Sequence, residues 1–93
     1  MATVVKKAWP DYFEKVQNGQ KTFDLRIADF QINEGDTLIL KEWDPDTKMY
    51  TGREIAKTVS YVLKTKDAPF WNKDDIDTYG FQALSFKDEN KIK

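Results

Sequence analysis

The chain has 93 residues, a net charge of −1 at pH 7 and an aromatic content of 14%, which is ordinary for one small globular domain. It contains neither cysteine nor histidine, which excludes disulfides, thiolate metal sites and the commonest general acid or base. The near-balance of 15 basic and 16 acidic side chains excludes a broad attractive field for nucleic acid, so any such binding must use a local patch.

The first part of the chain predicts a short strand followed by a helix. Residues 3–5 are the β-favouring run Thr-Val-Val. Over residues 9–18, apolar side chains recur at the spacing of one helix face. Pro10 suits the first turn of this helix, and Gly19 suits the position just after its end. A helix this short is not stable alone, so its apolar face must pack on the rest of the domain.

Residues 22–27 alternate polar and apolar side chains, which is typical of a half-buried strand. The alternation predicts that Phe23 and Leu25 point into the core. Asp24 and Arg26 then stand on the opposite face, with roughly 7 Å between their Cα atoms. An acid and a base on one strand face suit a polar site, and they equally suit an ordinary solvated strand.

Two strong strands are predicted next, at residues 37–43 and 53–63. The first is the run Thr-Leu-Ile-Leu-Lys-Glu-Trp, and the second alternates apolar and polar side chains. The turn signal Asp-Pro-Asp-Thr at residues 44–47 lies between them. This connection predicts that the two strands are antiparallel.

The last part of the chain is less regular. Within residues 64–79, a single helical turn is predicted to begin at Asn72, before a final strand at 81–86. The Phe-Trp pair at 70–71 is either a lid or partner-binding patch, or an apolar cluster under a long loop. Residues 87–93 are mostly charged and are expected to fray.

These elements predict one α+β domain over residues 1–86, with about five short, mainly antiparallel strands and one main helix. A closed or partly closed small β-barrel is favoured because closure removes vulnerable sheet edges. No apolar run is long enough to span a membrane and no signal segment is evident, so a cytoplasmic protein is expected. A monomer is also expected. The side chains predicted to be largely buried are Trp9, Phe13, Val16, Phe23, Leu25, Leu38, Leu40, Ile55, Val59, Leu84 and Phe86.

Several blocks, taken in order, resemble the ASCH domain of the PUA-like superfamily, and in particular an uncharacterised bacterial and phage family of small ASCH-like proteins. The resemblance covers roughly residues 4–86. It implies a PUA-like mixed β-barrel with a helix at one side, and a cleft beside the Gly-x-Lys strand that is usually assigned to RNA or nucleotide binding. The blocks are Pro-Asp-Tyr-Phe at 10–13, Gly-Gln-Lys-Thr-Phe-Asp-Leu-Arg at 19–26, Gly-Asp-Thr-Leu-Ile-Leu-Lys-Glu at 35–42 and Tyr-Thr-Gly-Arg at 50–53.

A few ASCH domains are enzymes, so the resemblance also implies enzymatic activity as an alternative to binding. One group hydrolyses the acyl amide of N4-acetylcytidine with a Lys, a Thr and a Glu, and another member has been described as a ribonuclease. Lys21 matches the lysine of the hydrolase motif, whereas Asp24 stands where that motif has its nucleophilic Thr. Amidohydrolase activity is therefore not transferred to this chain. The similar proteins also usually carry Glu at the position of Asp24, so this shorter carboxylate can reach a different partner.

The candidate ligand-binding residues are Lys21, Asp24, Arg26, Glu42 and Arg53. Lys21 or Arg26 could bind a phosphate while Asp24 accepts a base N–H. The plainer alternative is an exposed Asp24–Arg26 ion pair, with Lys21 as a surface lysine near the helix end. Arg53 is either a groove cation or a cross-strand partner of Glu42. The first three residues are expected to line one concave surface, with Glu42 or Arg53 at its rim.

Three functions stay open at this point. A binding module for RNA, a nucleotide or a modified nucleoside ranks first. An enzyme with Lys21 and Asp24 as its working pair ranks second, because Lys–carboxylate chemistry does not require histidine. A protein-interaction domain that uses the aromatic pair at 70–71 ranks third. Neither a cofactor nor a metal is expected, since the twelve-residue calcium-loop pattern is absent from the sequence.

Overall fold

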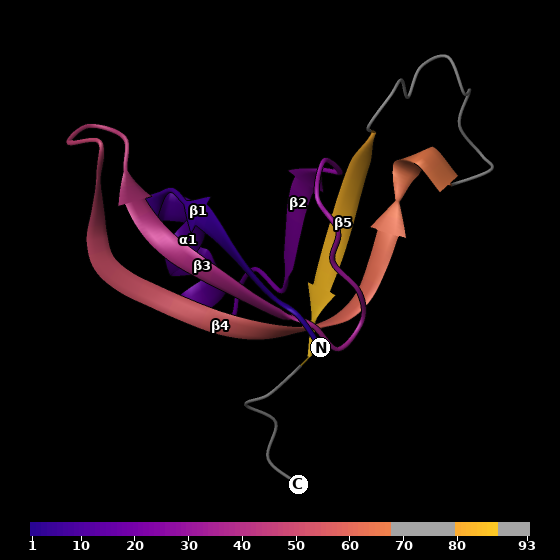
Figure 1. The fold of residues 1–93 in the computed structure, drawn as a ribbon. Coiled ribbons are helices and arrows are strands. Elements are labelled where there is room, and N and C mark those ends of the chain that lie inside the picture. Colours follow the sequence, from indigo (N-terminus) through magenta and orange to yellow (C-terminus); the bar gives the residue numbers. More distant parts are fainter. Residues whose placement is uncertain (68–79, 88–93) are drawn as a thin grey trace, which may run out of the picture.

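The computed structural model describes residues 1–67 and 80–87, which form a five-stranded sheet and one α-helix (Figure 1). The order across the sheet is β1-β3-β4-β5-β2. The β1–β3 pair is parallel, and the other three pairs are antiparallel. The elements are β1 (Thr3–Ala8), α1 (Pro10–Gln17), β2 (Phe23–Ile27), β3 (Thr37–Asp44), β4 (Met49–Lys64), the short 3₁₀-helix η1 (Thr65–Asp67) and β5 (Phe81–Phe86).

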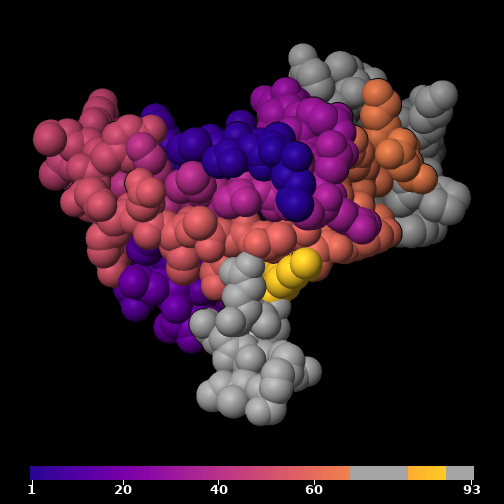
Figure 2. Space-filling model, turned by 60° about the horizontal axis from the view of Figure 1, so that its bottom comes forward, coloured from indigo at the N-terminus to yellow at the C-terminus, as the bar shows by residue number. Residues whose placement is uncertain are grey.

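Strand β4 joins the two halves of the sheet. Its first part pairs with β3 and its last part pairs with β5. The β4–β5 register shifts between Val59 and Tyr61, and such an irregularity bends a strand. Figure 1 shows β4 curving under the molecule, with β3 and β1 rising on one side and β5 and β2 on the other. In the space-filling view of Figure 2, β4 crosses the whole width of the face that is turned forward.

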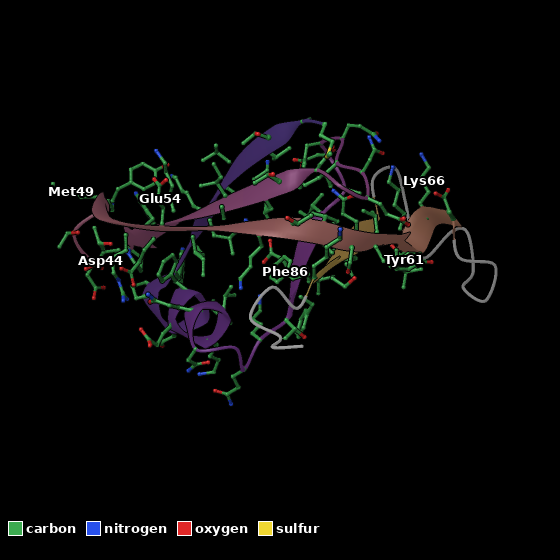
Figure 3. The ribbon with its side chains drawn as sticks, turned by 90° about the horizontal axis from the view of Figure 1, so that it is seen from below. Asp44, Met49, Glu54, Tyr61, Lys66 and Phe86 are labelled. Carbon is green, nitrogen blue, oxygen red and sulfur yellow. The ribbon has the colours of Figure 1, made fainter. Side chains whose placement is uncertain are left out.

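The core lies between α1 and the inner side of the bent sheet. Phe13 and Val16, three residues apart on one helix face, are both buried, and α1 contacts β3. Seen from below, α1 lies to one side of β4, which runs from Met49 toward η1 (Figure 3). The buried apolar side chains are Ala8, Phe13, Val16, Ile32, Leu38, Leu40, Val59 and Leu84. Six of the eleven residues predicted to be buried are therefore fully buried, while Ile55 and Phe86 pack partly against this core.

Pairing extends two strands beyond their predicted limits. β1 continues from the predicted residues 3–5 to Ala8, because parallel pairing with β3 holds its less strand-like lysines in line. β4 starts at Met49 because Tyr50 pairs with Trp43 across a hairpin. In that hairpin Lys48 adopts a φ of 57°, a left-handed value that closes the turn. The antiparallel β3–β4 pair and the bounds of β5 are confirmed.

Of the closed or partly closed barrel that the sequence predicted, the closed form is not shown. Among the described residues, β1 and β2 are the two edge strands of the sheet and no ladder joins them. A side chain crosses the opening between them, since Nη2 of Arg26 donates a hydrogen bond to the carbonyl of Lys7 at 2.7 Å. The mainly antiparallel five-stranded sheet with one helix is confirmed, and one arginine links its two edges where a barrel would have a ladder.

The predicted orientation of β2 is wrong. Asp24 is only 6% exposed, whereas Phe23 and Leu25 are 49% and 59% exposed. The register with β5 explains this, because Asp24 lies opposite Leu84, which is fully buried. Residues directly opposite in an antiparallel pair share a face, so the polar face of β2 turns inward. Trp9, also predicted to be buried, is exposed beside the start of α1.

Other predictions fall outside the described residues. These are the helical turn beginning at Asn72, the aromatic pair at 70–71 and all of the predicted tail except Lys87. Within residues 1–67 and 80–87, no helix has the length and apolar character needed to cross a membrane.

In the turn before β3, the carboxylate of Asp36 holds the start of the chain in place through hydrogen bonds. Asp36 is nearly buried, and its two oxygens accept hydrogen bonds from the backbone N–H of Ala2 at 2.9 Å and of Asn33 at 2.8 Å. These two donors hold the pKa of the Asp36 carboxyl below its usual value. Asp36 therefore links β1 to the turn and to the β3–β4 pair.

We expect Asp36→Asn to lower stability at pH 7 and to flatten the loss of stability in acid. Because folding lowers this pKa, the contribution of Asp36 is complete above the unfolded-state value of about 3.9 and is lost as the pH falls through the folded-state value. Urea unfolding between pH 7 and pH 3 measures both effects. Asp46→Asn, at an exposed turn position, is the matched control. Identical acid slopes for wild type and Asp36→Asn would contradict this role.

Candidate ligand-binding cleft

A cleft of about 640 Å³ opens between β1, α1 and β2, at the edge where the sheet is not closed. The end of β1 and the first turn of α1 form one wall, and β2 forms the other. Leu40 of the core lies at its base. The lining residues are Lys7, Ala8, Trp9, Tyr12, Val16, Lys21, Phe23, Asp24, Leu25, Arg26 and Leu40.

The carboxylate of Asp24 lies at the centre of the polar part of this cleft. Its Oδ2 accepts a hydrogen bond from Nε of Arg26 at 2.7 Å, and its Oδ1 lies 3.4 Å from Nζ of Lys21. The ammonium of Lys21 also donates to the carbonyl of Phe23 at 2.9 Å. Two cations therefore compensate a nearly buried carboxylate, which explains why the polar face of β2 can face inward. The structure brings the three predicted residues Lys21, Asp24 and Arg26 together.

The local backbone places these side chains. Gly19 ends the helix region with a φ of 86°, which a residue with a Cβ rarely adopts. The chain then turns back, and the N–H of Lys21 donates to the carbonyl of Lys15 at 2.8 Å. This turn brings Lys21 to the mouth of the cleft just before β2 begins. The β2–β5 register then sets Arg26 on the same face as Asp24.

The cleft has an excess of positive charge. Three cationic side chains, Lys7, Lys21 and Arg26, and one carboxylate, Asp24, are among its lining residues, so the lining carries a net charge of +2. The chain as a whole carries −1. A weakly acidic protein thus concentrates positive charge at one concave place, which is the local patch that anion binding would need.

Exposed aromatic rings border the charged groups. Trp9, Tyr12 and Phe23 line the cleft, and each is about half exposed. The ammonium of Lys21 lies 4.9 Å from the centroid of the Phe23 ring. Sequence reasoning missed this rim because it assigned Trp9 and Phe23 to the core. The signal that could have corrected it was the pair of cations beside Asp24, since these make an inward-facing carboxylate tolerable.

Glu42 and Arg53, predicted at the rim, do not line this cleft. Glu42 is buried, and its carboxylate receives two hydrogen bonds of 2.9 Å from Nε and Nη2 of Arg53. Its Oε1 also accepts the hydroxyl of Thr51 at 2.6 Å. Arg53 extends to α1, where Nη1 donates to Gln17 at 3.0 Å and Nη2 lies 3.4 Å from a carboxylate oxygen of Glu14. Arg53 is therefore the cross-strand partner of Glu42, and together they attach α1 to the sheet.

The hydrogen bonds from Arg53, and then the one from Thr51, hold the pKa of the Glu42 carboxyl below its usual value. In turn, the hydrogen bond to Glu42 raises the pKa of Arg53 above its usual range. Both groups are therefore charged at neutral pH. Glu42 and Arg53 therefore form an ion pair that stabilises the structure. Neither side chain has a pKa suited to donating or accepting a proton in catalysis near neutral pH.

The remaining described residues provide neither a group of metal ligands nor a second set of polar side chains for this cleft. Among residues 1–67 and 80–87, no group of three or more acidic side chains is arranged to hold a metal ion. A second cavity of about 570 Å³ lies beside the end of β4. It is lined by Ala28, Asp29, Phe30, Gln31, Lys64, Lys66 and Asp67, with charges that balance.

The chain is similar to proteins whose activity is not described. It is 36% identical over 56 residues to an "Uncharacterized 12.9 kDa protein in GpA 3'region" of Escherichia phage P2. The aligned region covers 60% of this chain and spans half the length of the phage protein. The family described as "Domain of unknown function (DUF3850)" matches residues 5–75, which include most of β1 and all of α1, β2, β3 and β4. Because this match covers well over half of the 93 residues, the chain belongs to the DUF3850 family.

Proposed function

We propose that the cleft binds one nucleotide unit, either as a free nucleotide or within single-stranded RNA. The observation that carries this proposal is the buried Asp24 carboxylate, which lies between Lys21 and Arg26 in a cleft bordered by exposed aromatic rings. A nucleotide presents an anion, a planar ring and N–H donors. The cleft offers cations, ring faces and a carboxylate acceptor within one small space.

Each group of the ligand has a matching partner. A phosphate would meet Lys21 or Arg26, whose side chains are 15% and 24% exposed and thus reachable from the cleft. A base would stack on Trp9 or Phe23, and such stacking contributes about 1–3 kcal/mol per base. The N–H donors at a base edge would meet Asp24, which accepts but cannot donate when it is ionised.

Size, charge and resemblance support the same proposal. A volume of about 640 Å³ lies within the usual range for small-molecule sites. The net charge of +2 at the lining favours a ligand with one or two phosphates over a long polyanion. Residues 19–26, which carry Lys21, Asp24 and Arg26, also form the block that resembles the ASCH domain. The resemblance connects the strand after Gly-x-Lys with RNA or nucleotide binding.

We expect Lys21→Ala and Arg26→Ala each to weaken binding of a nucleoside monophosphate by about tenfold or more, because a hydrogen bond to a charged group contributes about 1.5–3 kcal/mol. Asp24→Asn should change which base is preferred more than it changes affinity, since the amide is both donor and acceptor. Calorimetric titration with the four ribonucleoside monophosphates measures both effects. Lys15→Ala, an exposed lysine on α1 outside the cleft, is the matched control.

The salt dependence distinguishes a cleft from a basic surface. Few cations line the cleft, so we expect release of about one or two counterions, which gives a shallow slope of affinity against salt. Short single-stranded RNAs, titrated beside the monophosphates at two salt concentrations, separate a free nucleotide from a nucleotide within RNA. A clear gain in affinity with RNA length would favour RNA as the ligand.

Two outcomes would reject the proposal. Indistinguishable binding by wild type, Lys21→Ala, Arg26→Ala and Asp24→Asn would remove this cleft from consideration. Turnover of a nucleotide or RNA by the wild type, lost in Lys21→Ala and Asp24→Asn, would replace a binding module with an enzyme. In both cases circular dichroism of each variant shows whether the fold is retained.

A further inference from the structure

The outward side of β2, β5 and the end of β4 presents a continuous apolar surface. The antiparallel registers place Leu25 opposite Ala83 and Ala83 opposite Leu63, so these three side chains share one face of the sheet. The same face carries the row Phe23, Ser85 and Tyr61. We call this surface the outer apolar face, and its large side chains are Phe23, Leu25, Ile27, Tyr61, Leu63 and Phe81.

These six side chains are between 37% and 59% exposed. Aromatic side chains carry about 150–250 Å² each, so at half exposure Phe23, Tyr61 and Phe81 present roughly 225–375 Å², and Leu25, Ile27 and Leu63 add to this. The largest apolar patch on a typical monomer is about 300–600 Å², and a stable interface buries about 800 Å² on each partner. The aromatic side chains alone therefore reach the size of a typical largest patch, and the aliphatic side chains extend the face toward the area that a stable dimer needs.

The relief and charge of this face favour a copy of itself as the partner. Small side chains on β5, Ala83 and Ser85, lie between the larger side chains of β2 and β4 on this face. In a two-fold arrangement, the β2 row of one copy can pack over these small residues of the other, and symmetry repeats the contact. None of the six large side chains is charged. The six side chains of two copies can therefore meet without placing like charges opposite each other.

We propose that two copies of this chain associate through the outer apolar face to form a two-fold dimer in which the sheets pack face to face. The interface is the β2–β5–β4 surface, and the free edges of β1 and β2 do not take part. This differs from the monomer expected from the sequence. Phe23 and Leu25 of this face also line the cleft, whereas Ile27, Tyr61, Leu63 and Phe81 do not, so variants at these four positions test the dimer separately from ligand binding.

Sedimentation equilibrium of the full chain tests the proposal over about 1 µM to 1 mM, the range in which modest interfaces dissociate. We expect the mass to rise from 10.9 kDa toward twice that value as the concentration increases. Ile27→Lys and Leu63→Lys should each weaken association by at least about tenfold, because each would place two lysines in an apolar contact. Val5→Lys is the matched control, since Val5 is an exposed apolar residue of β1 outside this face.

Each other result would overturn the proposal in a distinct way. A wild type that stays monomeric throughout would rule out self-association through this face. Association that is lost in Ile27→Lys but kept in Leu63→Lys would identify the free edge of β2 as the contact, because Leu63 lies on an interior strand. Equal weakening by Val5→Lys would show that the association is not specific to this face.

Discussion

Phe13→Ala is expected to lower the free energy of unfolding by about 3–5 kcal/mol. The Phe13 side chain is fully buried, and it is the largest side chain that α1 places in the core. The guanidinium of Arg53 also lies 5.0 Å from the centroid of its ring. Since small domains have about 5–15 kcal/mol of total stability, this single truncation should bring the protein close to unfolding. Urea unfolding followed by circular dichroism measures the change.

The neighbouring aromatic residue supplies the control for this expectation. Tyr12→Ala removes a ring of similar size from the same helix turn, but the Tyr12 side chain is 58% exposed. Exposed substitutions usually change stability by less than about 0.5 kcal/mol. A similar loss in both variants would show that helix propensity, and not burial against the sheet, determines the stability of α1.

Local patterns in the sequence were sufficient to predict most elements. The helical spacing around Phe13 and the glycine that ends the helix region predicted α1 almost at its observed bounds. Period-two alternation and turn residues predicted β2, β3 and β5 to within one residue at each end. These features are local because they depend on neighbours a few residues apart. The extra length of β1 and β4 depends on pairing with strands elsewhere, so their predicted bounds were too short.

Alternation identifies which residues share a face, but it does not identify which face is buried. For β2 the hydrophobic rule favours Phe23 and Leu25 inside, and the structure has the reverse. Asp24 can lie inward because Arg26 and Lys21 both reach it, and Arg26 also reaches across to the edge of β1. These compensating contacts involve residues up to 19 positions apart. No single-strand pattern contains that information.

The same distinction separates the two groups of predicted site residues. Lys21, Asp24 and Arg26 meet because they are close in sequence, and a two-residue alternation already sets two of them on one side. Glu42 and Arg53 meet each other through the hairpin of β3 and β4. Their distance from the cleft depends on where α1 crosses the sheet, which is a matter of tertiary packing. The sequence therefore predicted each small group but not the separation between the groups.

Arg53→Met is expected to destabilise the protein more than Glu42→Gln does. The Glu42 side chain is 5% exposed whereas that of Arg53 is 48% exposed, so the two partners differ in what they lose. Without Arg53, the buried carboxylate keeps only the hydroxyl of Thr51. A buried group left without its partners costs about 1–3 kcal/mol, and more when it is charged. Without the charge of Glu42, Arg53 can turn to water and keep its contacts with α1.

The pH dependence should identify the carboxylate as the cause. In the wild type, folding lowers the pKa of Glu42, so its stabilisation is complete above the unfolded-state value of about 4.3 and is lost as the pH falls through the folded-state value. Removing Arg53 removes the largest cause of that lowering, and the folded-state pKa of Glu42 should rise. The difference in stability between wild type and Arg53→Met should therefore be greatest near pH 7 and should shrink below about pH 4.

A double variant completes the test of this ion pair. In Arg53→Met with Glu42→Gln, no buried charge is left without a partner, so the loss of stability should be smaller than the two single losses added together. This variant has no carboxyl at position 42. A raised Glu42 pKa therefore makes no contribution to the difference in stability between this variant and the wild type. Urea unfolding of all four proteins at pH 7 and near pH 3.5 provides the comparison. Additive losses at both pH values would show that Glu42 and Arg53 act on stability independently, despite two hydrogen bonds of 2.9 Å between them.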